Sequence, residues 1–272
     1  MLPLLFSFVL AQAETIGSAQ LGLSYNRIGL GLVAQHGVHI PKWEKEGNVL
    51  FQGTGIQAVG EINTSPAFIK PGVRFTIIPI AVLKLQAYAF ADYYYGNFQT
   101  IIVYDDLDVN YGTNSDMKSY TENTDRQYSG GGWHGGGKLV LQAKVKDIIF
   151  MNSTDYSHNY IATPEGETSP ATFDRLNEVM IALEGDQLLT NDTLLLYHME
   201  GENEKFLRAG LLNTYRQTFK ADDRLYRTGV IGMANTGGKG MHIFMVQPYV
   251  IDRTYGQSWT EPYIAYAYKY VY

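Results

Sequence analysis

The last nine residues of the chain alternate between two kinds of side chain more strictly than any other stretch. Ile264, Tyr266, Tyr268, Tyr270 and Tyr272 are separated by Ala265, Ala267, Lys269 and Val271. Successive side chains of a β-strand point to opposite faces. The pattern therefore predicts a strand with an aromatic ladder on one face and small or charged residues on the other. Because a chain end is an unusual place for a soluble core, we expect the ladder to face lipid.

This stretch resembles the C-terminal assembly signal of bacterial outer-membrane β-barrels, in which alternating apolar residues end on an aromatic residue. Tyr272 stands where Phe is commoner in that family. The resemblance implies that Ile264, Tyr266, Tyr268, Tyr270 and Tyr272 are read by the barrel-assembly machinery during biogenesis. It also implies that outer-membrane lipid surrounds the folded protein, as in porins. No more specific family is indicated.

Residues 1–13 form an apolar run that ends in the small-x-small site Ala11-Gln12-Ala13. Such a segment predicts a signal peptide cleaved before Glu14, and the run is too short to span a bilayer as a helix, which needs ~20 residues. No Lys or Arg precedes the run, so the usual positive n-region is missing. The alternative is a buried N-terminal strand or helix.

No window contains 18 consecutive apolar residues, which excludes a helical membrane protein unless the signal itself is an anchor. A closed barrel is then the one remaining spanning structure. A mean hydropathy of −0.16 agrees with a wet interior, and 21 tyrosines agree with aromatic girdles at the membrane interfaces. The chain has no cysteine, so it predicts no disulfides, and its net charge of −6 argues against nucleic acid as a partner.

Alternating segments fill the rest of the chain and predict an all-β fold: a single closed, antiparallel, transmembrane up-and-down β-barrel over residues 14–272. The candidate strands are 20–33, 49–62, 68–78, 82–94, 98–104, 138–144, 148–156, 176–183, 193–199, 206–219, 225–234, 241–251 and 264–272. This odd count conflicts with the even number of strands in bacterial single-chain barrels. We therefore expect about 12 strands, with 14 as the alternative. Residues 98–104 and 20–33 are the segments whose assignment is least secure.

Two long polar stretches, near residues 105–137 and 157–174, predict extracellular loops, because the long loops of such barrels lie outside the cell. Asp105-Asp106-Leu107-Asp108 suggests calcium, but Tyr111 and Met117 stand where the EF-hand pattern requires Gly and Glu. We predict no metal site and no cofactor.

Charged residues alternate with the apolar positions and predict the lining of a lumen. The candidates are Lys70, Arg74, Lys84, Asp92, Lys138, Lys144, Arg208, Arg216 and Lys269. If the lumen is open, this basic lining favours small anionic solutes and predicts a small porin or transport channel. The alternative is a plugged interior in which these cations pair with carboxylates, since side chains fill small barrels.

Two other functions stay open at this stage. Ser157, His158 and Asn159 have the residue types of an outer-membrane lipid-acting enzyme, but neighbours on a strand point to opposite faces and cannot form one triad. The third reading is a soluble secreted β-protein whose apolar strand faces form an ordinary core.

Overall fold

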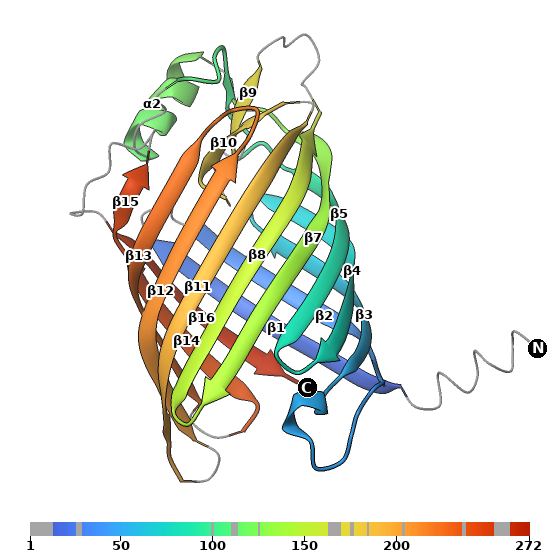
Figure 1. The fold of residues 1–272 in the computed structure, drawn as a ribbon. Coiled ribbons are helices and arrows are strands. Elements are labelled where there is room, and N and C mark those ends of the chain that lie inside the picture. Colours follow the sequence, from blue (N-terminus) through green and yellow to red (C-terminus); the bar gives the residue numbers. More distant parts are fainter. Residues whose placement is uncertain are drawn as a thin grey trace, which may run out of the picture.

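The structure, a computed structural model, describes residues 13–25, 29–98, 101–109, 114–124, 126–162, 170–174, 177–183, 185–202, 205–235, 238–252 and 262–272. The expected signal peptide lies outside these residues, apart from its last position. The chain forms a closed antiparallel barrel of twelve strands, which confirms the predicted fold (Figure 1). No helix of the described part of the chain is long and apolar enough to cross a membrane.

Each barrel strand pairs with its neighbours along the chain, and the first strand pairs with the last. The strands are β1 (Glu14–Tyr25), β2 (Gly29–Pro41), β3 (Gly55–Ser65), β4 (Phe68–Ile80), β5 (Leu83–Tyr94), β7 (Gly130–Val145), β8 (Ile148–Ile161), β11 (Asp186–Glu200), β12 (Phe206–Thr218), β13 (Arg224–Asn235), β14 (Gly240–Gln247) and β16 (Tyr263–Val271). Beyond Pro248, β15 (Tyr249–Asp252) continues the position of β14 along β13. Closure comes from β1 on β16, with Leu21 opposite Tyr268.

The strand count corrects the sequence assignment in three places. Residues 20–33 belong to two strands, β1 and β2, rather than to one imperfect strand. Residues 98–104 and 176–183 contribute no barrel strand, because they supply β6 (Val103–Tyr104) and β10 (Val179–Ala182) to a separate small sheet. Dividing residues 20–33 adds one barrel strand, and the two reassigned segments remove two, so the thirteen candidate strands become twelve.

The outer surface of the barrel is apolar and exposed. Leu23, Val73, Leu211 and Val230 are 51%, 63%, 53% and 55% exposed, although they come from four strands around the circumference. The same face of β16 carries Tyr266, Tyr268 and Tyr270, also exposed. Water would make so much apolar surface unfavourable, whereas lipid accommodates it. This exterior overturns the soluble β-protein alternative.

One part of the outer surface is polar and satisfies its own hydrogen bonds. The Asn152 amide donates to Asn191 over 3.2 Å and to the Thr193 hydroxyl over 2.8 Å. The Asn191 amide donates in return to Asn152 over 3.3 Å and to Thr154 over 2.7 Å. We call these four residues the outer polar ladder. Both asparagines lie on the paired strands β8 and β11.

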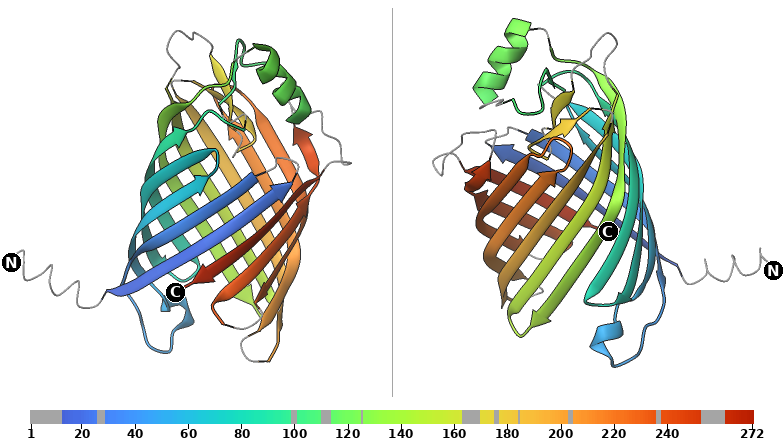
Figure 2. Two further views of the ribbon diagram at one scale, coloured as in Figure 1. Left: turned by 180° about the vertical axis from the view of Figure 1, so that it is seen from behind. Right: turned by 45° about the horizontal axis from the view of Figure 1, so that its top comes forward.

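The two ends of the barrel differ. Tyr272 lies at the end with the short turns, and the longest connections lie at the opposite end together with α2 (Asn114–Thr124) (Figures 1 and 2). Bacterial barrels place their chain ends in the periplasm and their long loops outside. The end with α2 is therefore extracellular, and the end with Tyr272 is periplasmic.

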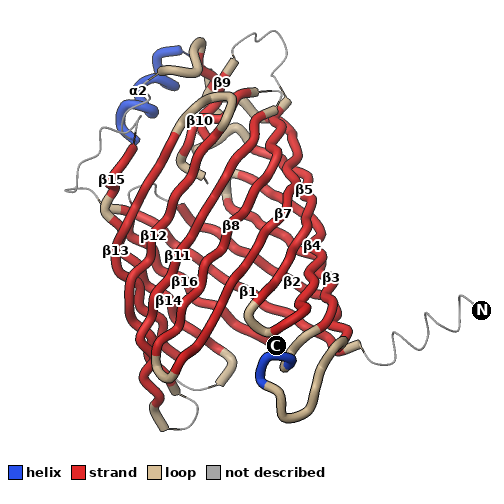
Figure 3. Tube along the Cα trace, viewed as in Figure 1, coloured by secondary structure: helices blue, strands red, loops and turns tan. Residues whose placement is uncertain are grey.

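A three-stranded sheet, which we call the plug sheet, lies in the extracellular mouth (Figures 2 and 3). It contains β6 from the connection between β5 and β7, and β9 (Ala171–Asp174) and β10 from the connection between β8 and β11. The loops expected near 105–137 and 157–174 are thus partly structured: β7 begins at Gly130, β8 runs on to Ile161, and β9 starts at Ala171. The start of β7 is rich in glycine, which has no side chain, so the sequence shows no alternation there from which a strand could be predicted.

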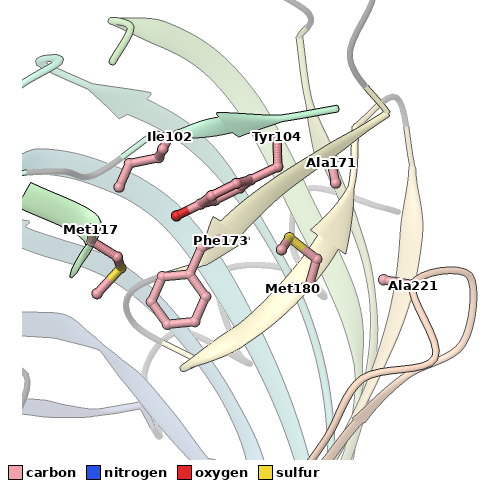
Figure 4. Close-up of a cluster of buried hydrophobic side chains, with 7 residues drawn as sticks. All are labelled: Ile102, Tyr104, Met117, Ala171, Phe173, Met180 and Ala221. Carbon is pink, nitrogen blue, oxygen red and sulfur yellow. The ribbon is translucent and has the colours of Figure 1, made fainter. Parts of the chain in front are cut away.

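The plug sheet has its own apolar core. Tyr104, Phe173 and Met180 pack together with Met117 of α2 and Ala221 of the turn between β12 and β13 (Figure 4). A second cluster joins Ile101 and Val103 to Phe68 and Tyr94 of the barrel wall. All of these side chains are buried. Protein therefore fills the extracellular half of the lumen.

Candidate functional site

All nine sequence-predicted lumen residues lie at strand positions that alternate with exposed outer residues. Lys138, for example, lies directly opposite Asp155 of the neighbouring strand. Lys144 reaches the periplasmic rim, where its Nζ lies 3.8 Å from a carboxylate oxygen of Glu200 and its side chain is 47% exposed. Arg208 lies near the same rim, where its Nε donates to His198 over 3.1 Å.

Arg74 is held by a two-point ion pair inside the barrel. Its Nε and Nη2 donate to Glu61 over 3.1 and 3.2 Å, and its Nη1 donates to Gln86 over 3.2 Å. Gln35 donates to the same carboxylate over 2.7 Å. A bidentate Arg–carboxylate pair fixes both side chains, so β2, β3, β4 and β5 are joined by one network across the lumen wall.

Asp92 is the centre of a second network. Its carboxylate lies 3.6 Å from Lys70 Nζ and 2.8 Å from His134 Nδ1. Lys70 also donates to the Tyr94 hydroxyl over 2.8 Å. The His134 ring stacks on Phe90 with 4.8 Å between centroids and 2° between planes. Asp92 and Phe90 therefore fix the orientation of the imidazole.

The structure separates Ser157 and Asn159 from His158, as strand alternation requires. Ser157 and Asn159 are buried in the interior, where the Asn159 amide donates to the Ser157 hydroxyl over 3.0 Å. His158 lies on the other face, with its ring 5.3 Å from that of Trp133. The three adjacent residues form no triad.

The plug sheet is attached to the barrel by contacts that we call the latch. Glu178 lies 2.8 Å from Arg227 Nη1 and 3.8 Å from Arg216 Nη1, and Arg216 also donates to the carbonyl of Asn177 over 2.6 Å. Arg227 is almost completely buried and stacks over the Tyr263 ring at 4.0 Å. Buried ion pairs of this kind are costly to break from one side.

Asp186 completes the latch through backbone contacts. Its carboxylate accepts from the backbone N–H groups of Ala182, Phe219, Lys220 and Ala221 over 3.0, 3.2, 2.8 and 3.1 Å. These donors come from the end of β10 and from the extracellular turn between β12 and β13. One buried side chain thus ties the plug sheet to the barrel rim.

Sequence reasoning missed most of the latch. Arg227 could have been found, because it alternates with Val230 and its lipid-facing neighbours once the phase of β13 is set. Glu178 and Asp186 could not, because the first belongs to a segment assigned to the barrel and the second was placed in a connection. Among the described residues, no three His, Cys, Asp or Glu side chains gather in a way that could hold a metal ion.

The periplasmic half of the lumen has one apolar wall. It is built by inward-facing residues of five adjacent strands: Ile149, Met151, Leu194, Leu196, Leu212, Ile231, Met233, Ile243 and Met245. The central leucines and Ile231 are buried. The residues that keep part of their surface accessible are Ile149, Met151, Met233, Ile243 and Met245. Here protein does not fill the interior as it does at the extracellular end.

No protein-family model matches the sequence, and neither does any curated protein sequence. Among solved structures, the β domain of the Bordetella autotransporter BrkA is 9% identical and has a TM-score of 0.44, with 95% of this chain and 99% of that chain covered. LpxR from Salmonella typhimurium is 7% identical with a TM-score of 0.44, covering 93% and 99%. OmpT, an outer membrane protein of Vibrio cholerae, in its trimer form, is 8% identical with a TM-score of 0.40, covering 96% and 99%.

These likenesses give no residue of this chain a role. The closed barrel itself, with an even number of strands and an apolar exterior, is that of a bacterial outer-membrane protein.

Proposed function

We propose that the protein is a gated transport channel of the outer membrane, closed at its extracellular end by the plug sheet. One observation carries the proposal. Protein fills the lumen at its extracellular end, whereas partly accessible polar and apolar side chains line it at its periplasmic end. The fill is a separate sheet attached to the wall by the latch, by a hydrogen bond from the Met180 N–H to Asp223 and by apolar contacts, rather than by barrel strands folded inward. Breaking these attachments leaves the backbone ladders between the barrel strands intact, so the sheet can move as a unit.

The lumen lining supports a preference for anions. Glu61 balances Arg74 and Asp92 balances Lys70 through the contacts described above, and Lys138 lies opposite Asp155 in strand register. The side chains of Lys84 and Lys269 have no ion pair or hydrogen bond within the described part of the chain, and each feels the charge of the other. Unpaired cations in a pore lower the barrier for anions. Small anionic solutes are therefore the proposed cargo.

Single-channel recording in planar bilayers tests the channel. We expect wild-type protein to open rarely, and the double variant Glu178→Gln, Asp186→Asn to open often, because both latch carboxylates lose their charge. Asp105→Asn is the matched control, since Asp105 is an acid at the same end that pairs with Arg126 outside the latch. A double variant that folds, as judged by heat-modifiable migration, and still shows no channel events would rule the gated channel out.

A lipid-acting enzyme is the second candidate, because Asp92 and His134 have the arrangement of the orienting acid and the base of a hydrolase. Ser157 is the nearest candidate nucleophile by strand position, but it is hydrogen-bonded to Asn159 and makes no contact with His134. Hydrolysis of a p-nitrophenyl ester by refolded protein tests this candidate. Activity that disappears in both His134→Ala and Ser157→Ala would establish it, and activity unchanged in either would exclude the pair.

A further inference from the structure

The apolar wall of the periplasmic half faces a polar wall. Across the lumen from its methionines and leucines, β2, β3, β4 and β5 direct Gln35, Gln57, Thr76 and Gln86 inward. A water-filled channel for small ions needs no apolar wall, and a filled core would bury it. An apolar wall that stays partly accessible opposite a polar wall is the lining expected for an amphipathic molecule. Methionine is also a side chain that adapts to chains of differing shape.

Two cations lie at the periplasmic end of this chamber, and neither has an ion pair or hydrogen bond with the described residues. Lys269 is paired in register with Met241, at the edge of the apolar wall, and the next inward pair along the same strands is Ala267 with Ile243. Lys84 lies near the periplasmic end of β5 and interacts electrostatically with Lys269. The two lysines lie on strands five apart in the barrel, so they face one another across the lumen. An anion between them would interact favourably with both charges.

The far end of the chamber is closed. Directly above the apolar wall, the inward Thr214 hydroxyl donates to Asp192 over 2.9 Å. Beyond this polar pair, Leu188 and Leu225 pack on Val179 of the plug sheet. A molecule that enters from the periplasm would thus meet the lysines first and the apolar wall next, which is the order of a head group and its chain in a single-chain amphiphile.

We propose that the periplasmic half of the lumen binds a single-chain amphiphile with an anionic head group, such as a carboxylate or phosphate, with its head at Lys84 and Lys269 and its chain along the apolar wall. This inference rests on the proposed function in one respect, since it names the substrate class of that channel. Binding itself needs no opening of the plug sheet, so it can be measured separately from conductance.

Photolabelling of the full-length protein in lipid nanodiscs tests the proposal. The probe is palmitic acid that carries a diazirine near its methyl end, and labelled residues are mapped by peptide mass spectrometry. Every outward residue will react with probe dissolved in the lipid, so Val230 and Phe244 report that background. We expect labelling of the partly accessible inward residues Met233, Ile243 and Met245 well above it, and competition by unlabelled palmitate.

Two comparisons address the head group. The corresponding diazirine fatty alcohol should label the inward residues about tenfold less, because one charge-assisted hydrogen bond is worth about 1.4 kcal/mol or more. Lys84→Gln with Lys269→Gln should reduce labelling by the acid to the level of the alcohol. Lys144→Gln, which removes a rim cation paired with Glu200, should leave it unchanged.

The outcomes separate this proposal from the channel. Inward labelling no stronger than at Val230, or equal labelling by acid and alcohol, overturns amphiphile binding. Inward labelling by the acid in a protein whose latch variants never conduct would retain the binding site and reject the channel. Latch variants that conduct while the lumen stays unlabelled would do the opposite. Palmitate released in competition by inorganic phosphate alone would point to an anion site without a chain site, and would also overturn the proposal.

Discussion

The Asp186 carboxylate accepts a hydrogen bond from the backbone N–H of Ala182 over 3.0 Å, and so joins the end of the plug sheet to the start of a barrel strand. The same carboxylate binds the neighbouring extracellular turn. A few buried charges therefore tie the plug sheet to the barrel rim, in addition to the apolar contacts.

Arg227→Met is expected to destabilise the protein by about 3–5 kcal/mol, because it leaves the Glu178 carboxylate buried without its closest cation. The double variant Glu178→Met, Arg227→Met should regain most of this loss, since the buried carboxylate and its closest cation are removed together and Arg216 keeps its hydrogen bond to the carbonyl of Asn177. Urea unfolding in lipid vesicles measures both. Equal stabilities of the single and double variants would show that Arg216 alone can satisfy Glu178.

Tyr272 is expected to matter for assembly through its ring more than through its hydroxyl. The ring covers Gly17 so closely that a Cβ there would lie 2.3 Å from it, whereas the hydroxyl makes a long 3.3 Å bond to the carbonyl of Gln35. Tyr272→Phe should leave the folded fraction in the outer membrane near wild type, and Tyr272→Ala should lower it several-fold. Heat-modifiable migration of membrane fractions measures this. Val271→Ala, on the opposite face of the strand, is the control.

The outer polar ladder is expected to stabilise only as a complete set. Asn191→Leu removes the partner of Asn152 and Thr154, and an unsatisfied polar group of this kind costs about 1–3 kcal/mol. Replacing both asparagines by Leu removes the unsatisfied amide as well, so the double variant should be more stable than either single one. A double-mutant cycle on unfolding free energies checks this, and additive losses would contradict it.

Lys84 and Lys269 are expected to set the charge preference of the unlatched channel. In the background Glu178→Gln, Asp186→Asn, a salt gradient should give a reversal potential with the sign for anions. Adding Lys84→Glu and Lys269→Glu should reverse that sign, because the two cations without partners become two anions. Adding Lys144→Glu instead should move the potential much less, because Lys144 is exposed at the rim and screened by solvent.

Much of the barrel could be predicted from the sequence, because alternation is a direct record of which strand face meets lipid. Alternation alone, for example, assigns Lys84 and Leu85 to opposite faces of β5, and Leu85 is exposed on the outer face. The plug sheet could not be predicted in this way. Val179–Ala182 is buried on both faces, and an apolar run of that length looks the same in a membrane strand as in a plug.

Glycine limited the prediction at the start of β7. Gly136 stands where a Cβ would lie 2.3 Å from the carbonyl oxygen of Tyr156, so close approach of the two backbones requires glycine there. The same absence of side chains made the stretch look like a loop. Prediction of the candidate site met a different limit. Alternation identifies which cations face inward, but it does not identify their partners, because a partner such as Glu178 belongs to a distant part of the chain.

The plug sheet draws its strands from two connections, on either side of the hairpin formed by β7 and β8. Val103 can meet Thr172 only when that hairpin has paired in its native register. In a misfolded molecule in which β7 pairs with β8 in a shifted register, β6 and β9 would also pair in a shifted register, and we expect the mouth to stay open. In a protein with an intact latch, leakiness to external dyes is thus the expected sign that this hairpin has paired in the wrong register.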